Sequence, residues 1–334
     1  MFNIYPWQKK QWQFLLSMHH QNRLPQALLF KGVQGLAKRR FSELFSTYVL
    51  CDDLSKGEKP CGQCRSCELM RAGNHPDFYC VEPLEKSKLI KVDQVRDLTG
   101  QLEQTSHRDG HQVVIMHPAE MMNRSAANAL LKTIEEPVGH VLIILVCDKT
   151  NTLPATILSR CQQLAFSANA DQDNISWVQQ QLNTEKVGEK RRDEAALLLG
   201  LADHAPQQAL ALMESGYLEL RDQTLRHFLR MQKGEIDPIA PVADFLKKDV
   251  TLLMHAIMTL LMDLIRLQLG VKTEHLFHRD RIAQLQILCR SHNVMTLQNY
   301  FSSCQQVQSA LQSSIHLNPQ MLLESLFIKY NETK

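Results

Sequence analysis

The sequence predicts an α/β region followed by helices, and three observations lead to this prediction. Val141–Val146 (VLIILV) is continuously apolar, as is typical of a parallel strand covered on both faces. Strand-like and helical segments alternate as far as residue 166, the pattern of a parallel sheet with crossover helices. Beyond that residue the apolar positions have helical spacing as far as residue 334. We therefore expect a largely parallel sheet and then helices alone.

The first elements follow from apolar spacing. A helix is expected at Trp7–His20, because Pro6 suits a helix start and large apolar residues follow it. Ala27–Phe30 is a short apolar segment and predicts a buried strand. Ala37–Leu50 has apolar residues near i, i+3 and i+4 spacing, which predicts a second helix.

The rest of the α/β region repeats the alternation. Gln112–Met116 (QVVIM) is rich in β-branched residues and predicts a central strand. Asn123–Glu136 has an apolar helical face and is ended by Pro137. The other expected elements are a strand at Phe78–Val81, a helix from Ile90 to about Gln104, a short helix at Pro154–Leu158 and a last strand at Gln162–Phe166.

The remaining segments read as helices and suggest three domains. The expected helices include Ile175–Asn183, Asp193–Leu201, Pro206–Met213, a leucine-rich one at Leu252–Leu269 and a last one at Met321–Tyr330. We place an α/β module at 1–167, a small helical domain at 168–208 and a helical domain at 209–334.

Composition limits the class of protein. The 334 residues allow two or three domains, and 44% hydrophobic with 22% charged residues is typical of a globular chain. The net charge of +2 provides no global basic field, so any contact with DNA has to be local or shared with partners. We see no signal peptide and no apolar run of the about 18 residues that a membrane helix needs. We expect a cytoplasmic protein.

The loop after the first strand resembles a phosphate-binding loop with parts missing. The pattern G-x-x-x-x-G-K-[ST] uses backbone N–H groups, a lysine and a Mg²⁺-binding hydroxyl to hold phosphates. Gly32 and Lys38 fit this pattern, and Gly35 lies between them. Ala37 replaces the second glycine and Arg39 replaces the hydroxyl. The loop alone is as consistent with an accidental match as with a degenerate ATP site.

A second strand end lacks the acidic residues that ATP hydrolysis needs. An ATPase of this kind places acidic residues there to hold Mg²⁺ and to activate water. The strand QVVIM is instead followed by His117 and Pro118, which cannot replace an aspartate as ligands of a hard cation. We predict no ATP hydrolysis by this chain alone and weak or no nucleotide binding. Lys38 is expected on the surface or paired with a local carboxylate.

Four clustered cysteines predict a structural metal site. Cys51, Cys61, Cys64 and Cys67 lie within a polar, loop-like insertion at 51–67. Four thiolates with C-x₂-C spacing can surround Zn²⁺ tetrahedrally and leave no open position for a reactive water. Four unrelated thiols or an iron–sulfur cluster are the alternatives. The scattered cysteines are expected to be buried small hydrophobes.

One arginine is a candidate to act on a nucleotide that a neighbouring subunit binds. LPATILSRC (Leu153–Cys161) follows the strand VLIILV and contains Arg160. An arginine at a rigid domain edge can reach a neighbour's nucleotide and stabilise charge in the transition state. Taken alone, an arginine in such a turn is more often solvated.

These features together resemble the delta-prime subunits of the bacterial DNA polymerase III clamp loader, along essentially the whole chain. The resemblance lies in the cysteine insertion, SAANALLKTIEEP (Ser125–Pro137), LPATILSRC and the degenerate loop. It implies an AAA+-type module, a helical lid and a helical collar. It also implies an idle nucleotide site and an arginine, Arg160, that faces the ATP of a neighbouring subunit.

The resemblance further implies the partners. These would be gamma or tau ATPase subunits and a delta subunit in a five-membered ring that loads the sliding clamp on primed DNA. Two positions depart from the ATPase members of the family: Cys147 replaces a small polar residue and Gln207 replaces a lid arginine. Both departures agree with an idle site.

Parts of the sequence are also compatible with two other functions. One is a self-sufficient ATPase that uses Lys38 and Arg39. The other is a zinc-ribbon nucleic-acid reader whose cations include Lys59, Arg65 and Arg71. The near-neutral charge and the lack of interleaved aromatic residues argue against the second.

Overall fold

The computed structural model describes residues 3–55, 57–84, 87–103, 110–136, 139–169, 171–184, 194–312 and 318–332. The helix boundaries expected at Gln104, Pro137 and Asp193 lie outside these residues. The chain forms two compact units, and each is described by itself. The first comprises Met1–Trp177 and His204–Gln208, and the second comprises Val178–Asp203 and Ala209–Lys334.

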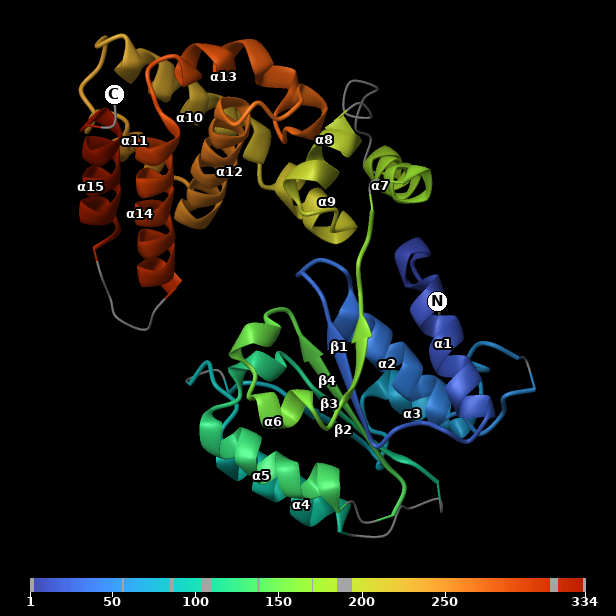
Figure 1. The fold of residues 1–334 in the computed structure, drawn as a ribbon. Coiled ribbons are helices and arrows are strands. Elements are labelled where there is room, and N and C mark those ends of the chain that lie inside the picture. The colour runs from blue at the N-terminus through green and yellow to red at the C-terminus, as the bar shows by residue number, and fades with distance from the viewer. Residues whose placement is uncertain are drawn as a thin grey trace. The chain divides into compact units, whose positions relative to one another are not determined.

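The first unit is built on a parallel five-stranded sheet (Figure 1). Its strands are β1 (Ala27–Lys31), β2 (Phe78–Val81), β3 (Gln112–Met116), β4 (Val141–Cys147) and β5 (Gln162–Ala165). They lie in the order β2-β3-β4-β1-β5, and every pairing is parallel. The expected α/β module with a largely parallel sheet is confirmed. The central strands place their carboxyl ends at one edge, where Lys31 of β1 is level with Cys147 of β4.

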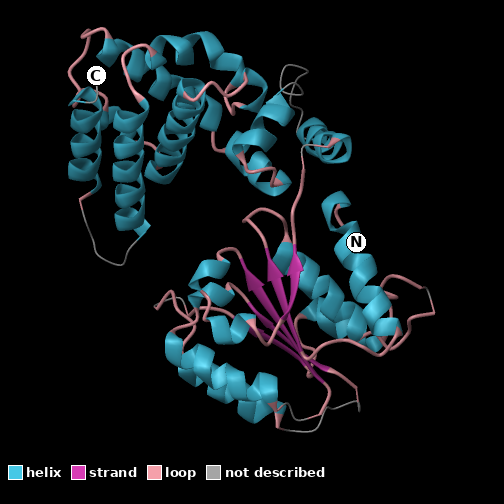
Figure 2. Cartoon of the chain, viewed as in Figure 1, coloured by secondary structure: helices cyan, strands magenta, loops and turns pink. Residues whose placement is uncertain are grey.

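Alternate side chains of the central strands supply two separate cores. Leu29 and Leu145 point into one core and Leu28 and Ile144 into the other, as the two-residue period of a strand requires. Helices therefore cover both faces of the sheet (Figure 2). They are α1 (Lys9–His20), α2 (Lys38–Val49) and α3 (Arg65–Ala72), and α4 (Val92–Leu102), α5 (Arg124–Glu135) and α6 (Ala155–Leu158). The helix α3 was not predicted.

The second unit is helical throughout its described residues. Its core surrounds α12, which packs against α10, α13 and α14. The helices after the sheet are α7 (Gln172–Thr184), α8 (Glu194–Leu201), α9 (Pro206–Glu214), α10 (Tyr217–Gln232), α11 (Val242–Phe245), α12 (Val250–Gln268), α13 (Ile282–Cys289), α14 (Val294–Gln312) and α15 (Pro319–Glu332). Short 3₁₀ helices are present at Pro6–Gln8, Ala119–Met121, Thr150–Thr152, Thr273–His275 and Arg279–Arg281. The predicted boundaries at 167 and 208 stay a prediction, because compactness does not test which segments act as lid and collar.

The helix α12 bears on the expectation that no apolar segment is long enough to cross a membrane. It has 19 residues with a mean hydropathy of 1.7 and is long and apolar enough to cross a membrane by length and composition. Half of that stretch is buried inside the protein, and Leu253, Ile257 and Leu260 are among its core residues. Asp263, in the same helix, is also fully buried. These features are those of a core helix, so the length test alone is weak support for a membrane span.

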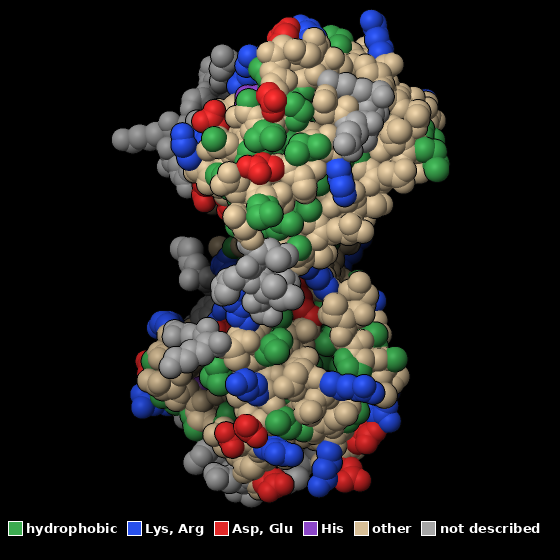
Figure 3. All heavy atoms as spheres, turned by 90° about the vertical axis from the view of Figure 1, so that its left-hand side faces the viewer, with side chains coloured by type: hydrophobic (Ala, Val, Ile, Leu, Met, Phe, Trp, Pro, Cys, Tyr) green, Lys and Arg blue, Asp and Glu red, His purple; other side chains and the backbone are tan. Residues whose placement is uncertain are grey.

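Charges of both signs are mixed on the surface. On the face seen in Figure 3, acidic and basic side chains lie among one another over both units. This distribution agrees with the net charge of +2 and shows no broad single-sign field on that face. Strong electrostatic attraction of a partner therefore has to be local.

Candidate functional site

The loop between β1 and α2 has the form of a phosphate-binding loop but is packed against protein. Ala37, at the position of the missing glycine, has φ 56° and ψ 34° and so takes the left-handed conformation that glycine adopts without strain. A Cβ atom on Gly32 would lie 2.3 Å from the Phe166 carbonyl oxygen. A Cβ atom on Gly35 would lie 2.7 Å from the Cβ of Gln208. The glycines therefore allow close packing with the chain itself.

Lys38 is saturated by acceptors of its own protein. Its side chain is only 3% exposed, and Nζ donates to the carbonyl oxygens of Gly32 at 2.7 Å and Val33 at 2.8 Å. A third bond, of 2.5 Å, joins Nζ to Oδ1 of Asp148, just after β4. An ammonium group has three donors, so none of them is left for a phosphate. The expected pairing with a local carboxylate is confirmed, and the surface alternative is wrong.

The loop carbonyls are satisfied by residues from other segments of the first unit. Trp7 and Gln8 donate to the carbonyl oxygen of Leu36 at 3.1 and 2.8 Å, and both side chains are buried. The backbone N–H of Gln207 donates to the Gly35 carbonyl at 3.2 Å. Tyr5 stacks on Trp7 with ring centroids 4.7 Å apart, and the ring of Trp177 meets both of them edge-on. This cover over the loop was not predicted from the sequence.

At the carboxyl end of β3, His117 and Pro118 stand where an ATPase places acidic residues. His117 is half-buried, and burial, with a contribution from Arg39, lowers the pKa of its imidazole. Arg39 itself pairs with Glu82 at 2.7 Å and with Glu43 at 3.2 Å. Glu120 uses one carboxylate oxygen to accept the backbone N–H groups of Asp148 and Lys149. Carboxylate oxygens of Glu43, Glu82 and Glu120 therefore accept from cations or backbone donors of the protein itself.

The two departures from the ATPase pattern also face protein. Cys147 is fully buried at the end of β4, and burial, helped by Glu120, raises the pKa of its thiol to about 12. The side-chain amide of Gln207 donates to the hydroxyl of Tyr5 at 3.1 Å. Neither group offers a charge to a nucleotide.

Arg160 lies at the surface beyond the end of α6. Its side chain is 40% exposed, and Nε donates to a carboxylate oxygen of Glu135 at the end of α5. Nη1 donates to the carbonyl oxygen of Thr156 at 3.3 Å and to the hydroxyl of Ser159 at 3.4 Å. Nη2 has no partner within the described part of the chain. One end of the guanidinium is thus held while the other end is left to donate.

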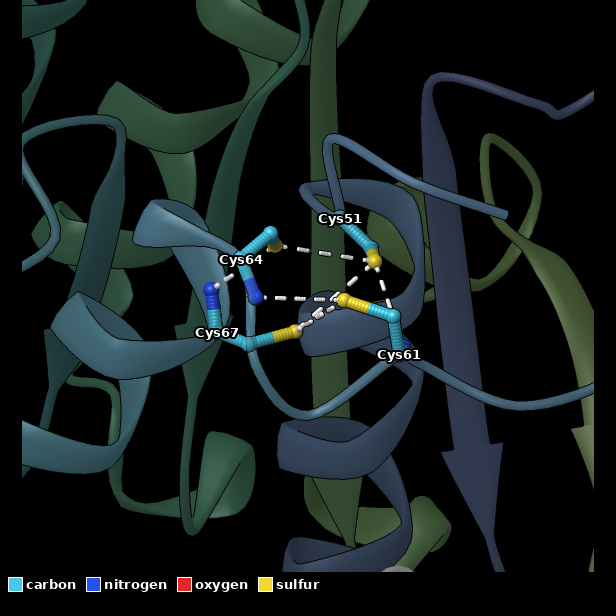
Figure 4. Close-up of side chains that lie close together, drawn as sticks. All are labelled: Cys51, Cys61, Cys64 and Cys67. Carbon is cyan, nitrogen blue, oxygen red and sulfur yellow. Dashed lines mark hydrogen bonds between the residues drawn. The ribbon is translucent and has the colours of Figure 1, made fainter. Parts of the chain in front are cut away.

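The four cysteines of the insertion lie together (Figure 4). Their Sγ atoms are all within 4.8 Å of one another, with separations of 3.9 Å for Cys51–Cys64, 4.0 Å for Cys61–Cys67 and 3.7 Å for Cys67–Cys51. A tetrahedron with Zn–S bonds of about 2.3 Å has edges of about 3.8 Å. The donor set and its spacing therefore fit Zn²⁺.

Backbone donors and a helix hold the four sulfurs in place. Cys64 is the N-cap of α3, and its Sγ accepts the backbone N–H of Cys67 at 3.4 Å. Hydrogen bonding from the backbone at Gln63 lowers the pKa of Cys61 to about 7, whereas burial raises the pKa of Cys67. A bound cation would favour the thiolate form of all four ligands.

A second layer of polar residues supports the cysteine module. Asp52 accepts from the backbone N–H and the hydroxyl of Ser66, and the same hydroxyl lies 3.0 Å from Nε2 of the buried His75. Arg71 donates to the carbonyl oxygen of Gly62 at 2.7 Å, so one of the cations considered for DNA is used inside the module. Lys59 and Arg65 remain exposed.

Three partners of the predicted site residues were missed. Asp148, Glu135 and Gln8 hold Lys38, Arg160 and the loop carbonyls respectively. For Asp148 a signal was present, because β1 and β4 are neighbouring parallel strands whose carboxyl ends meet at one edge. Neither of the other two partners has a spacing that marks it.

Two family models and several relatives match the chain. The model described as "DNA polymerase III, delta subunit" matches residues 7–170, and "DNA polymerase III, delta subunit, C terminal" matches residues 215–332. The DNA polymerase III subunit delta' of Pseudomonas aeruginosa is 32% identical over 333 residues, which cover 99% of this chain and 98% of that protein.

Two further relatives extend the comparison. The DNA polymerase III subunit delta' of Escherichia coli is 30% identical over 262 residues, 78% of this chain and 76% of that protein. The DNA polymerase III subunit tau of Salmonella typhimurium is 28% identical over 215 residues, 64% of this chain and 33% of that protein.

Proposed function

This chain belongs to the family of DNA polymerase III delta' subunits, and we propose that it is a non-hydrolysing member of a clamp loader. The observation that supports the proposal most directly is the internal saturation of Lys38 by Gly32, Val33 and Asp148. A lysine with three protein acceptors has to break a charge-assisted bond before it can contact a phosphate. With Arg39 in place of the Mg²⁺ ligand, this chain is expected neither to hydrolyse ATP nor to bind it tightly.

We propose that Arg160 acts in trans on the ATP of an adjacent subunit. The proposal rests on its exposure, on the tether from Nε to Glu135 and on the remaining donor at Nη2. A guanidinium presented in this way can stabilise charge that develops on a transferring phosphoryl group. This chain would then complete a neighbour's active site while its own site stays idle.

The proposed partners are gamma or tau ATPase subunits and a delta subunit, in a five-membered ring that loads the sliding clamp on primed DNA in the cytoplasm. The similarity to a tau subunit supports a common module for this chain and the ATPase subunits. We further propose that residues 168–208 act as a lid and that residues 209–334 form the collar that joins the ring.

We propose a structural Zn²⁺ bound by Cys51, Cys61, Cys64 and Cys67. The spacing of the sulfurs supports this role, and four protein ligands leave no position open for a catalytic water. The ion would fix the insertion against α2 and contribute to local stability rather than to chemistry.

Reconstitution of the complex from this chain and the ATPase subunits tests the proposed role of Arg160. Arg160→Ala should leave assembly intact, as measured by size-exclusion chromatography. It should lower the rates of ATP turnover and clamp loading by about tenfold or more. Arginines that act in trans in well-studied GTPases raise the hydrolysis rate by a factor of about 10³–10⁵. Arg96→Ala is the matched control, since Arg96 is also exposed and its ion pair with Asp93 lies within α4. Unchanged turnover with Arg160→Ala would contradict the role in trans.

The purified chain tests the idle site. It should show no Mg²⁺-dependent ATP hydrolysis, and Lys38→Ala should leave this background rate unchanged. Hydrolysis that disappears in Lys38→Ala would instead establish a self-sufficient ATPase.

A further inference from the structure

A basic pocket lies in the second unit and has no role in the proposed site. It is a hollow of about 430 Å³ between α10 and the segment that contains α11. Four cations and one acid line it, together with three uncharged or weakly basic side chains. The lining residues are Arg226, Arg230, Lys247, Lys248 and Asp244, with Gln223, His227 and Phe245.

The cations of this basic pocket are available to a ligand. Arg226 and Lys248 are exposed and make no ion pair with any other described residue. Arg230 pairs with Glu235 at 3.6 Å, and both side chains are about half exposed. Lys247 pairs with Asp244 at 3.5 Å, where both side chains are more than 70% exposed. Exposed pairs of this kind contribute about 0–1 kcal/mol and exchange readily for another anion.

The positive potential also acts on a neighbouring histidine. His227 lies in α10 between the two arginines, with its Nδ1 buried and unpartnered among the described residues. Burial lowers the pKa of His227, and the charges of Arg230 and Arg226 lower it further, while Asp244 opposes them. Arg226 and Arg230 line the hollow, and their positive charge also acts on this neighbouring side chain.

We propose that this basic pocket binds the phosphate backbone of DNA. Arg226 and Arg230 are four residues apart on α10, so they project from the same face about 6 Å apart along the axis. Their guanidinium groups can each donate two hydrogen bonds to the oxygens of neighbouring phosphates. Lys247 and Lys248 add point charges from the opposite wall of the pocket. The proposal adds a DNA contact to the proposed function and depends on neither Arg160 nor the cysteines.

A nucleic acid fits this basic pocket better than an acidic protein segment does. Protein partners are usually anchored by apolar or aromatic side chains at the centre of an interface. Here the aromatic lining residue, Phe245, is only 1% exposed and offers no such anchor. Contact with a phosphate backbone needs only well-placed cations and is independent of base sequence.

The test uses the full-length chain and a fluorescein-labelled oligothymidylate, with the dissociation constant measured by anisotropy at several salt concentrations. On a single strand, the logarithm of the affinity falls with the logarithm of the salt concentration, with a slope of about 0.7 for each phosphate neutralised. Arg226→Ala combined with Lys248→Ala should reduce that slope by about 1.4 and weaken binding about tenfold at low salt. Both residues are exposed, and a circular dichroism melt checks that the fold is kept.

Two double variants serve as controls of equal charge. Lys272→Ala with Arg290→Ala removes two exposed cations elsewhere in the second unit, and Lys59→Ala with Arg65→Ala removes two near the cysteines. Both should bind like the unaltered chain. The proposal is overturned if the oligonucleotide does not bind at low salt, or if the basic-pocket variant behaves like a control. It is also overturned if the Lys59–Arg65 variant shows the larger loss, or if polyglutamate displaces the DNA at equal charge concentration.

Discussion

Lys38 occupies the position of a phosphate-binding lysine, yet its three donors are used within the protein. Nearly complete burial makes the Asp148 carboxylate important, because an ammonium group without a counter-charge is costly in a protein interior. The neighbouring residues follow the same pattern, since Arg39 binds Glu82 and Glu120 binds backbone N–H groups. In this chain the motif residues therefore contribute to packing and charge balance within the protein.

Asp148→Asn tests this stabilising role. The amide can still accept a hydrogen bond from Lys38 but no longer balances its charge, so we expect the free energy of unfolding to fall by about 1–3 kcal/mol. Urea unfolding followed by tryptophan fluorescence measures the change. Asp97→Asn, on the exposed side of α4, is the control and should have little effect. Equal stability of the two variants would show that the Lys38–Asp148 pair contributes no net free energy.

The sequence located Lys38, Arg160 and the four cysteines but not the groups that hold them. A motif fixes residues that are close in sequence, whereas Asp148 is 110 residues from Lys38 and Glu135 is 25 residues from Arg160. Such partners depend on strand order and helix packing. The role of Arg160 stays a prediction, because the structure contains one chain and no neighbour.

At the scale of elements, the cysteine module is a short stretch whose stability depends on few apolar contacts. Cys67 and Ser66 are its buried residues on α3, and α3 has only eight residues. A helix of that length is marginal by itself, so a bound metal would have a large share in fixing it. The α/β core has its own apolar strands and does not need the ion.

Removal of the metal should therefore loosen the module locally. We expect one Zn²⁺ per chain by elemental analysis of protein purified without chelator. Chelation, or Cys64→Ser, should speed hydrogen exchange in α3 while exchange in β4 stays slow. Ser46→Ala in α2 is a control that removes a hydrogen bond but no sulfur. A metal content near zero would contradict the zinc site, and global unfolding on chelation would contradict a local role.

The core helix α12 carries a histidine that should make stability depend on pH. Burial lowers the pKa of His255, although Asp203 acts in the opposite direction. The unfolded chain then takes up a proton at higher pH than the folded chain. The contribution of His255 is complete above its unfolded pKa of about 6.5 and is lost as the pH falls toward the lower folded pKa.

Circular dichroism melts at pH 7.5 and 5.5 measure this dependence. The drop in melting temperature at the lower pH should be smaller in His255→Gln than in the unaltered chain, because the glutamine cannot take up a proton. His275→Gln changes an exposed histidine beside Glu274 and serves as the control. An unchanged drop in His255→Gln would assign the pH dependence to other groups.

At the scale of the molecule, continuous or alternating apolar patterns predicted most of the fold. All five strands were expected close to their observed limits. The central strands β1, β3 and β4 are buried and read as apolar runs, whereas the edge strands β2 and β5 are partly exposed. The helix α3 was missed because cysteine ligands and charges replace an apolar stripe in it. The second unit was recognised as helical, but α10, α13 and α14 were not delimited, since amphipathic segments joined by short connections offer few boundary signals.

The two compact units have separate apolar cores, and this separation predicts non-coincident unfolding. All three tryptophans of the chain, Trp7, Trp12 and Trp177, belong to the first unit. Tryptophan fluorescence therefore reports the α/β unit, whereas helical circular dichroism includes the second unit. We expect the two probes to give different urea transitions, since coincident transitions are the mark of a two-state chain.

Two cavity-forming substitutions test whether the cores are independent. Leu264→Ala removes a fully buried side chain from the second core and should cost about 2–5 kcal/mol there. It should shift the circular dichroism transition and leave the tryptophan transition in place. Ile144→Ala in β4 should instead shift the tryptophan transition to lower urea concentration, because its buried side chain belongs to the core that contains Trp7 and Trp12. If either substitution shifts both transitions equally, the two units unfold as one cooperative body, and metal loss or protonation in one unit would then destabilise the other.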